Sequence, residues 1–155
     1  LEQVVSAVII VAVFAEAVRL RMGWTIVGQR SYEAKQVSAL AWGALGVGMV
    51  LLLAPDPAYA YPLILSLSLG DPLLGELRRN EVSTNTVIWA GAVGIALIWA
   101  SCAYFVDTPW FFVALMGPIC VASEWPRLRY IDDNATMLLI PLAVILVVDP
   151  FLGIM

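Results

Sequence analysis

The chain has 155 residues, of which 62% are hydrophobic and only 13% charged, and its mean hydropathy is +0.92. This apolar share is far above that of soluble domains, so we expect a single integral-membrane domain over residues 1–155. Eight Lys and Arg residues with no basic tract exclude a nucleic-acid-binding protein, and the absence of histidine excludes His-based catalysis.

Six apolar stretches follow one another along the chain. The first runs from about Val4 to Leu20 and is interrupted only by Glu16. The second, Val37–Ala54, and the fourth, Val87–Val106, carry no charge. At about 1.5 Å per residue, each of these two is long enough to cross a hydrocarbon core of roughly 30 Å. We therefore predict transmembrane helices at these positions.

The other three stretches are shorter, and each is bounded by acidic residues. They are Ala58–Gly70 before Asp71, Thr108–Ser123 before Glu124, and Ala135–Val148 after Asp132 and Asp133. With 13 to 16 residues they reach only roughly 20–24 Å. Either the helices continue through the acids, or protein encloses their polar ends below the membrane surface. Both arrangements gather the acids at one face, where they must point into the bundle or a water-filled cleft.

All the basic residues fall in alternate connections between these stretches. The first, third and fifth connections contain Arg19, Arg21, Arg30, Lys35, Arg78, Arg79, Arg127 and Arg129. The second and fourth connections contain only Asp56 and Asp107 as charged residues. Because Lys and Arg gather on the cytoplasmic side, we predict an all-α, multi-pass bundle of about six helices with both termini on the non-cytoplasmic side. The acids then face the cytoplasm.

A first group of candidate site residues ends the third stretch. If the helix continues, Asp71 and Gly75 share a face, and the glycine leaves space for a ligand beside the carboxylate. Arg78 and Arg79 follow one to two turns later. An acid that holds Mg²⁺ and arginines that clamp phosphate oxygens suit a metal–phosphate ligand. The alternative is that the arginines only enforce topology, with Asp71 as their partner.

A second group lies between the fifth and sixth stretches. Its members are Glu124, Arg127, Arg129, Asp132, Asp133 and Asn134. Asp and Asn are good helix N-caps, but a cap explains one acid and not two. Divalent-metal binding explains the excess, so we predict Asp71, Asp132 and Asp133 as catalytic residues and metal ligands. The arginines, Glu124 and Asn134 are predicted to bind the nucleotide.

Two further charged groups have structural explanations. Glu16 lies one turn before Arg19, and we expect an ion pair at the end of the first helix. Lys35 precedes the second helix and is either part of an ordinary helix opening or a phosphate-binding residue.

Cys102 and Cys120 lie inside apolar stretches, and we expect them to be buried and unpaired.

Acids for metal, arginines for phosphate and a lipid setting together indicate phosphoryl or nucleotidyl transfer involving a lipid. The sequence also resembles the CTP-dependent polyprenol kinase family, which includes dolichol and phytol kinases. The resemblance rests on Gly70-Asp71-Pro72, on Glu124 followed by Asp132-Asp133-Asn134, and on Pro141.

The resemblance implies phosphorylation of a long isoprenoid alcohol at the cytoplasmic face, with CTP as donor and Mg²⁺ as cofactor. Asp71 would bind metal or nucleotide, together with Gly70, while Asp132 and Asp133 would hold the metal or act as base. Two alternatives remain open: a lipid cytidylyltransferase that makes CDP-lipids, and a small transporter or channel. The sequence also leaves open whether the chain forms a homodimer.

Overall fold

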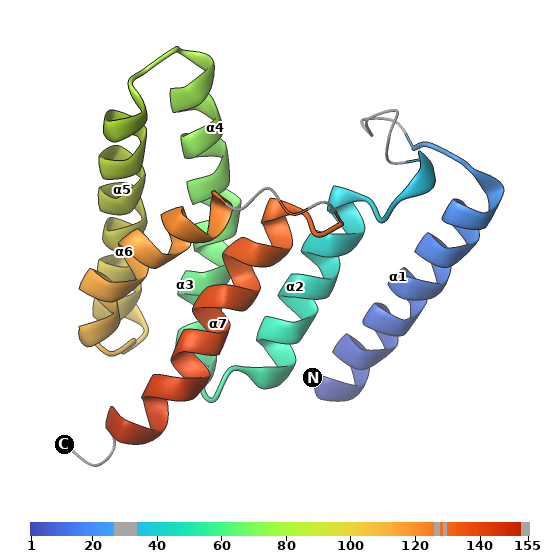
Figure 1. Ribbon diagram of the computed structural model, residues 1–155. Helices are drawn as coiled ribbons and strands as arrows, with labels where there is room; N and C mark the ends of the chain where they lie inside the picture. The colour runs from blue at the N-terminus through green and yellow to red at the C-terminus, as the bar shows by residue number, and fades with distance from the viewer. Residues whose placement is uncertain (27–33, 126–127, 129, 153–155) are drawn as a thin grey trace.

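The computed structural model describes residues 1–26, 34–125, 128 and 130–152, and all regular structure within these residues is helical (Figure 1). The elements are α1 (Glu2–Met22), α2 (Ala39–Leu53), α3 (Pro57–Leu65), the π-helix η2 (Ser66–Gly70), α4 (Asp71–Arg79), α5 (Thr84–Phe105), α6 (Phe111–Glu124) and α7 (Asp133–Leu152). The prediction of an all-α fold is confirmed. By length and composition α1, α5 and α7 are able to cross a membrane, while α2 and α6 are shorter apolar helices.

The third apolar stretch belongs to one unbroken helix. α3, η2 and α4 continue into one another from Pro57 to Arg79, and we call this 57–79 segment the central rod. Of the two arrangements expected from the sequence, the helix therefore continues through Asp71. Likewise α6 includes Glu124 as its last residue. The central rod and α7 are longer than the apolar stretches within them because their acidic ends are helical as well, whereas α6 has only 14 residues.

Successive helical segments run in opposite directions, so the basic residues meet at one end of the bundle (Figure 1). The described basic residues are Arg19, Arg21, Lys35, Arg78 and Arg79, and we call their end of the bundle the basic end. The start of α1 and the end of α7 lie at the opposite end (Figure 1). In Figure 1 the hairpin of α4 and the first turns of α5 extend beyond the ends of α6 and α7.

Side-chain caps define where several helices begin. Ser38 Oγ accepts a hydrogen bond from the Ala41 amide (3.2 Å) and starts α2, close to the predicted position. Asp56 Oδ1 accepts from the Ala58 amide (2.7 Å) and starts the central rod. Such caps satisfy amide groups that have no partner within the helix. At the other end of α1, Gly23 ends the helix with a φ of 67°, a conformation that glycine adopts without strain.

The core lies between the central rod, α5, α6 and α7. Trp99 on α5 is fully buried and donates from Nε1 to Ser66 Oγ (3.0 Å), which anchors the π-helical turn of the central rod to α5. Gly117 of α6 approaches α5 so closely that a Cβ there would meet the Ala92 carbonyl oxygen at 2.5 Å. Cys102 and Cys120 are buried and free, as predicted.

The helix α1 packs along α2 at the periphery of the bundle (Figure 1). The predicted ion pair is present: Arg19 donates from Nε and Nη2 to the two carboxylate oxygens of Glu16, each at 2.8 Å. Arg19 also donates to the carbonyl oxygens of Trp24 and Gln36, and the Ser38 amide donates to Glu16 Oε1 (2.7 Å). This network joins the end of α1 to the start of α2.

Candidate functional site

An ion pair between α4 and α6 forms the centre of the candidate site. Arg78 Nη1 lies 2.5 Å from Glu124 Oε1, and the side chains are 41% and 2% exposed, respectively. The Arg78 guanidinium carbon also lies 5.0 Å from the centroid of the Trp125 ring, within the range of a cation–π contact. Among the described side chains, Glu124 Oε2 is the one buried polar atom without a hydrogen-bond partner. This buried carboxylate oxygen is able to accept a hydrogen bond from a donor group of a ligand.

This pair borders a cavity of about 460 Å³ at the basic end, which we call the charged cavity. Its lining residues are Arg78, Val82, Thr84, Val87, Glu124, Trp125 and Asp133. They come from α4, the α4–α5 turn, the first turns of α5, the end of α6 and the start of α7. The volume lies within the range of small-molecule sites.

Asp71 lies close enough to the charged cavity to interact with its charges. Burial, and secondly the negative charge of Asp133, raise the pKa of Asp71, while Arg78 acts in the opposite direction. The charges of Asp71 and Asp133 also act on Glu124. Asp71 begins α4, beyond the apolar part of the central rod. The structure therefore brings together acids from both predicted groups, Asp71 from the first and Glu124 and Asp133 from the second. The positive charge of Arg78 partly offsets their negative charges.

Three other predicted site residues have structural contacts. Asp132 caps α7, since its Oδ1 accepts from the Asn134 amide at 3.1 Å. The Asn134 side chain faces α2, where its Nδ2 lies 3.5 Å from the Ala39 carbonyl oxygen. Gly70 packs against α5, where a Cβ would meet Ile95 at 3.1 Å. None of these residues lines the charged cavity as described.

The remaining predicted residues are dispersed. Gly75 has open space where a Cβ would be, in agreement with the space expected beside the carboxylate. Arg79 turns away from Glu124 and pairs with Glu76 at 2.6 Å on the exposed surface. Lys35 is exposed in the short turn that precedes α2. The other predicted residues, Arg127 and Arg129, lie outside the described residues, as does Arg30.

The predicted metal site is only partly assembled. Within the part of the chain that the structure describes, no group of three or more acidic, His or Cys side chains is arranged to hold a metal ion. The negative charge of Asp133 nevertheless acts on Asp71. A pair of carboxylates suits Mg²⁺, because its sites usually use one or two carboxylates and complete their shell with waters and substrate phosphates.

Comparisons with protein-family models, with curated proteins and with solved structures found no match. We therefore infer the chemistry of the site from its own residues.

Four lining residues of the charged cavity were not predicted as site residues: Val82, Thr84, Val87 and Trp125. Thr84 is the first residue of α5, directly after the turn that follows Arg79. Trp125 follows Glu124 in the chain and stacks near Arg78. The adjacency of Trp125 to a predicted ligand was a usable signal, whereas Thr84 is found only once α4 and α5 are known to fold back on each other.

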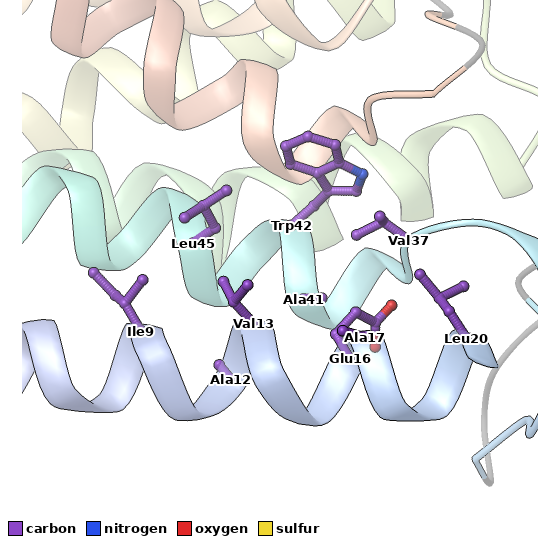
Figure 2. Close-up of a pocket in the computed structure, with 10 residues that line it drawn as sticks. All are labelled: Ile9, Ala12, Val13, Glu16, Ala17, Leu20, Val37, Ala41, Trp42 and Leu45. Carbon is purple, nitrogen blue, oxygen red and sulfur yellow. The ribbon is translucent and has the colours of Figure 1, made fainter. Parts of the chain in front are cut away.

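A second pocket, of about 290 Å³, lies between α1 and α2 (Figure 2). Figure 2 shows apolar side chains from both helices around it, including Ile9, Val13 and Leu45, with Glu16 toward one end. Both oxygens of Glu16 already accept hydrogen bonds from Arg19. The carboxylate of Glu16 is therefore already paired, and the pocket offers a ligand mainly apolar contacts.

Proposed function

We propose that this protein is a multi-pass membrane lipid kinase that transfers the γ-phosphoryl group of CTP to a long-chain isoprenoid alcohol. The observation that carries the proposal is the grouping of Arg78, Glu124 and Asp133 around one cavity, with Asp71 beside it. This charge cluster lies at one end of a bundle of apolar helices. By the positive-inside rule the basic end faces the cytoplasm and both chain ends lie on the other side.

Arg78 is the group on the cavity wall that suits a phosphate. A guanidinium offers planar, paired donors that match phosphate oxygens. Glu124 holds one nitrogen of Arg78 at 2.5 Å, and the Trp125 ring lies against the same guanidinium. The side chain is thus oriented before a ligand arrives, which lowers the entropy lost on binding.

The acids Asp71 and Asp133 fit a divalent cation. Their like charges oppose each other, and Asp71 is half-buried, so a cation would relieve an unfavourable arrangement. When bound there, Mg²⁺ would neutralise charge on the nucleotide phosphates. Asp132 contributes to this arrangement by capping α7 and so fixing the start of the helix that carries Asp133.

The reaction requires a base for the alcohol. The hydroxyl oxygen attacks the γ-phosphorus, the bond from this phosphorus to the β-phosphate oxygen breaks, and CDP leaves. Asp71 is the candidate base that accepts the hydroxyl proton, because it is a carboxylate beside the cavity that carries Arg78 and Asp133. Arg78 stabilises the charge of the phosphates.

The test uses purified protein with labelled CTP, Mg²⁺ and a panel of prenols. We expect a lipid phosphate and CDP as products. Asp71→Asn should lower the transfer rate by about 10²-fold or more, since it removes the base. Asp107→Asn is a matched control, because Asp107 is an exposed acid in the connection between α5 and α6, at the opposite end of the bundle.

Three results would contradict the proposal. Full activity of Asp71→Asn would remove its central residue. Pyrophosphate and a CDP-lipid as products would identify a cytidylyltransferase. Substrate flux across liposomes without nucleotide, and no product, would favour a transporter.

A further inference from the structure

A long apolar groove runs along α1 and α2 on the side that faces the central rod and α7. Its volume is about 560 Å³, and we call it the lateral groove. At one end it is lined by Val4 and Leu51, and at the basic end by Ala39 and Asn134. Every lining residue except Asn134 is apolar. A surface of this composition within a bundle of apolar helices suits hydrocarbon and not a solvated ligand.

Small residues on α2 create the width of the lateral groove. Gly43 and Ala44 line it, and a Cβ on Gly43 would lie only in ordinary contact, 3.8 Å from Asn134 Cβ. Ala44 is exposed. From Ala39 to Leu51 the helix rises roughly 18 Å, so the groove accommodates an extended chain of about four isoprene units.

The basic end of the lateral groove adjoins the candidate site. Asn134 lines the groove, and the preceding residue, Asp133, lines the charged cavity. The central rod also connects the groove to the candidate site. Leu67 lines the groove, and Asp71 lies one turn later on the same helical segment. The two elements that carry the candidate base and metal ligand therefore also form the inner part of the groove.

The pocket in Figure 2 does not have this connection. It lies between the same two helices, but its one acid, Glu16, is already bonded to Arg19 and the Ser38 amide. None of the acids of the candidate site lines it. A lipid in that pocket would have no reactive group near its polar end.

We infer that the lateral groove binds the hydrocarbon chain of the acceptor alcohol and delivers its hydroxyl to Asp71 and Asp133 at the basic end. This inference rests on the proposed function and assigns the chain-binding site for it. An amphiphile is the one occupant that matches both the apolar length of the groove and the acids at its inner end. Asn134 positions the hydroxyl, because its amide is the polar side chain where the chain ends.

The first experiment measures chain binding without catalysis. A prenol of four isoprene units, with a diazirine at the end remote from the hydroxyl, is bound to the protein in nanodiscs without CTP and photolysed. We expect peptide mapping to place the label on α1 or α2 near Val4 and Leu51. Ala44→Phe fills the groove and should lower labelling about tenfold. Ala114→Phe changes a similarly exposed alanine on α6 that lines no part of the groove, and should leave the labelling unchanged.

The second experiment compares chain lengths in the kinase assay. Ala44 lies roughly 8 Å along α2 from Ala39, beyond the reach of one isoprene unit. Ala44→Phe should therefore lower kcat/KM for a prenol of four units about tenfold and leave that for a prenol of one unit unchanged.

The outcomes separate the groove from the proposed function. Labelling on α5 and α6, equal labelling of Ala44→Phe and wild type, or equal competition by phosphatidylcholine and by unlabelled prenol would each overturn the assignment of the groove. The last result would identify an ordinary membrane-lipid site. If wild-type protein forms no phosphorylated product but groove labelling behaves as expected, the proposed function fails and the chain-binding site stands.

Discussion

Replacement of Arg78 by methionine tests whether the Arg78–Glu124 pair stabilises the fold. The variant keeps an unbranched side chain but leaves the Glu124 carboxylate, whose side chain is 2% exposed, without its counter-charge. Loss of one partner from a fully buried pair costs about 3–5 kcal/mol. Because Arg78 is 41% exposed, solvent screens part of its attraction, and we expect a loss of about 2–3 kcal/mol in unfolding free energy.

A double-mutant cycle separates the pair from the surrounding packing. Glu124→Gln removes the charge but keeps the side-chain shape, so its cost should be about 1 kcal/mol. In the double variant no buried charge remains, and we expect a coupling free energy of about 1–2 kcal/mol between the two positions. The unfolding free energies are measured by denaturation in mixed detergent micelles, followed by tryptophan fluorescence.

Arg79→Met is the matched control for this measurement. Arg79 pairs with Glu76, but both side chains are largely exposed, and the expected change is about 0.5 kcal/mol or less. Equal effects of Arg78→Met and Arg79→Met, or additive effects of the Arg78 and Glu124 substitutions, would refute the reasoning. Either result would show that the ion pair between Arg78 and Glu124 does not stabilise the fold more than an exposed ion pair does.

Two further predictions concern packing within the membrane region. Gly117→Ala places a Cβ 2.5 Å from the Ala92 carbonyl oxygen, so α5 and α6 must separate, and the protein should lose about 1–3 kcal/mol of stability in the same denaturation assay. An unchanged denaturation midpoint would show that the two helices are not in such close contact. Tyr59→Phe removes the hydroxyl that donates to Asp149 and should cost about 1.5–3 kcal/mol, seen as a lower Tm. A Tm equal to that of wild type would show that this contact does not join α3 to α7.

The helical architecture was predictable because apolar runs of this length have few alternatives. For the central rod, the sequence predicted the apolar part up to Gly70 but left open whether the helix stops or continues at Asp71. Its π-helical turn begins at Ser66, whose hydroxyl accepts a hydrogen bond from Trp99, and no local sequence pattern contains this tertiary contact. The same limit applies to the contact between Tyr59 and Asp149.

The site was predicted at the level of residue types and not of individual contacts. Arg78 and Arg79 are equivalent in the sequence, but adjacent helical residues point about 100° apart, so one reaches Glu124 and the other Glu76. Asp132 and Asp133 looked like one pair, yet the former caps α7 and the latter lines the charged cavity. Which face of a helix meets a neighbour is set by packing, and one sequence does not show it.

The central rod has a mechanical consequence. One continuous helical segment carries Leu67 on the lateral groove and, eleven positions later, Arg78 on the charged cavity. Leu67 lies within the π-helical turn Ser66–Gly70, and Pro72 follows it, so the segment has a place to bend between its apolar and polar parts. In the proposed kinase, a lipid tail that enters beside Leu67 would press on this bend and shift Arg78 relative to the charged cavity, so chain binding and phosphate binding would be coupled.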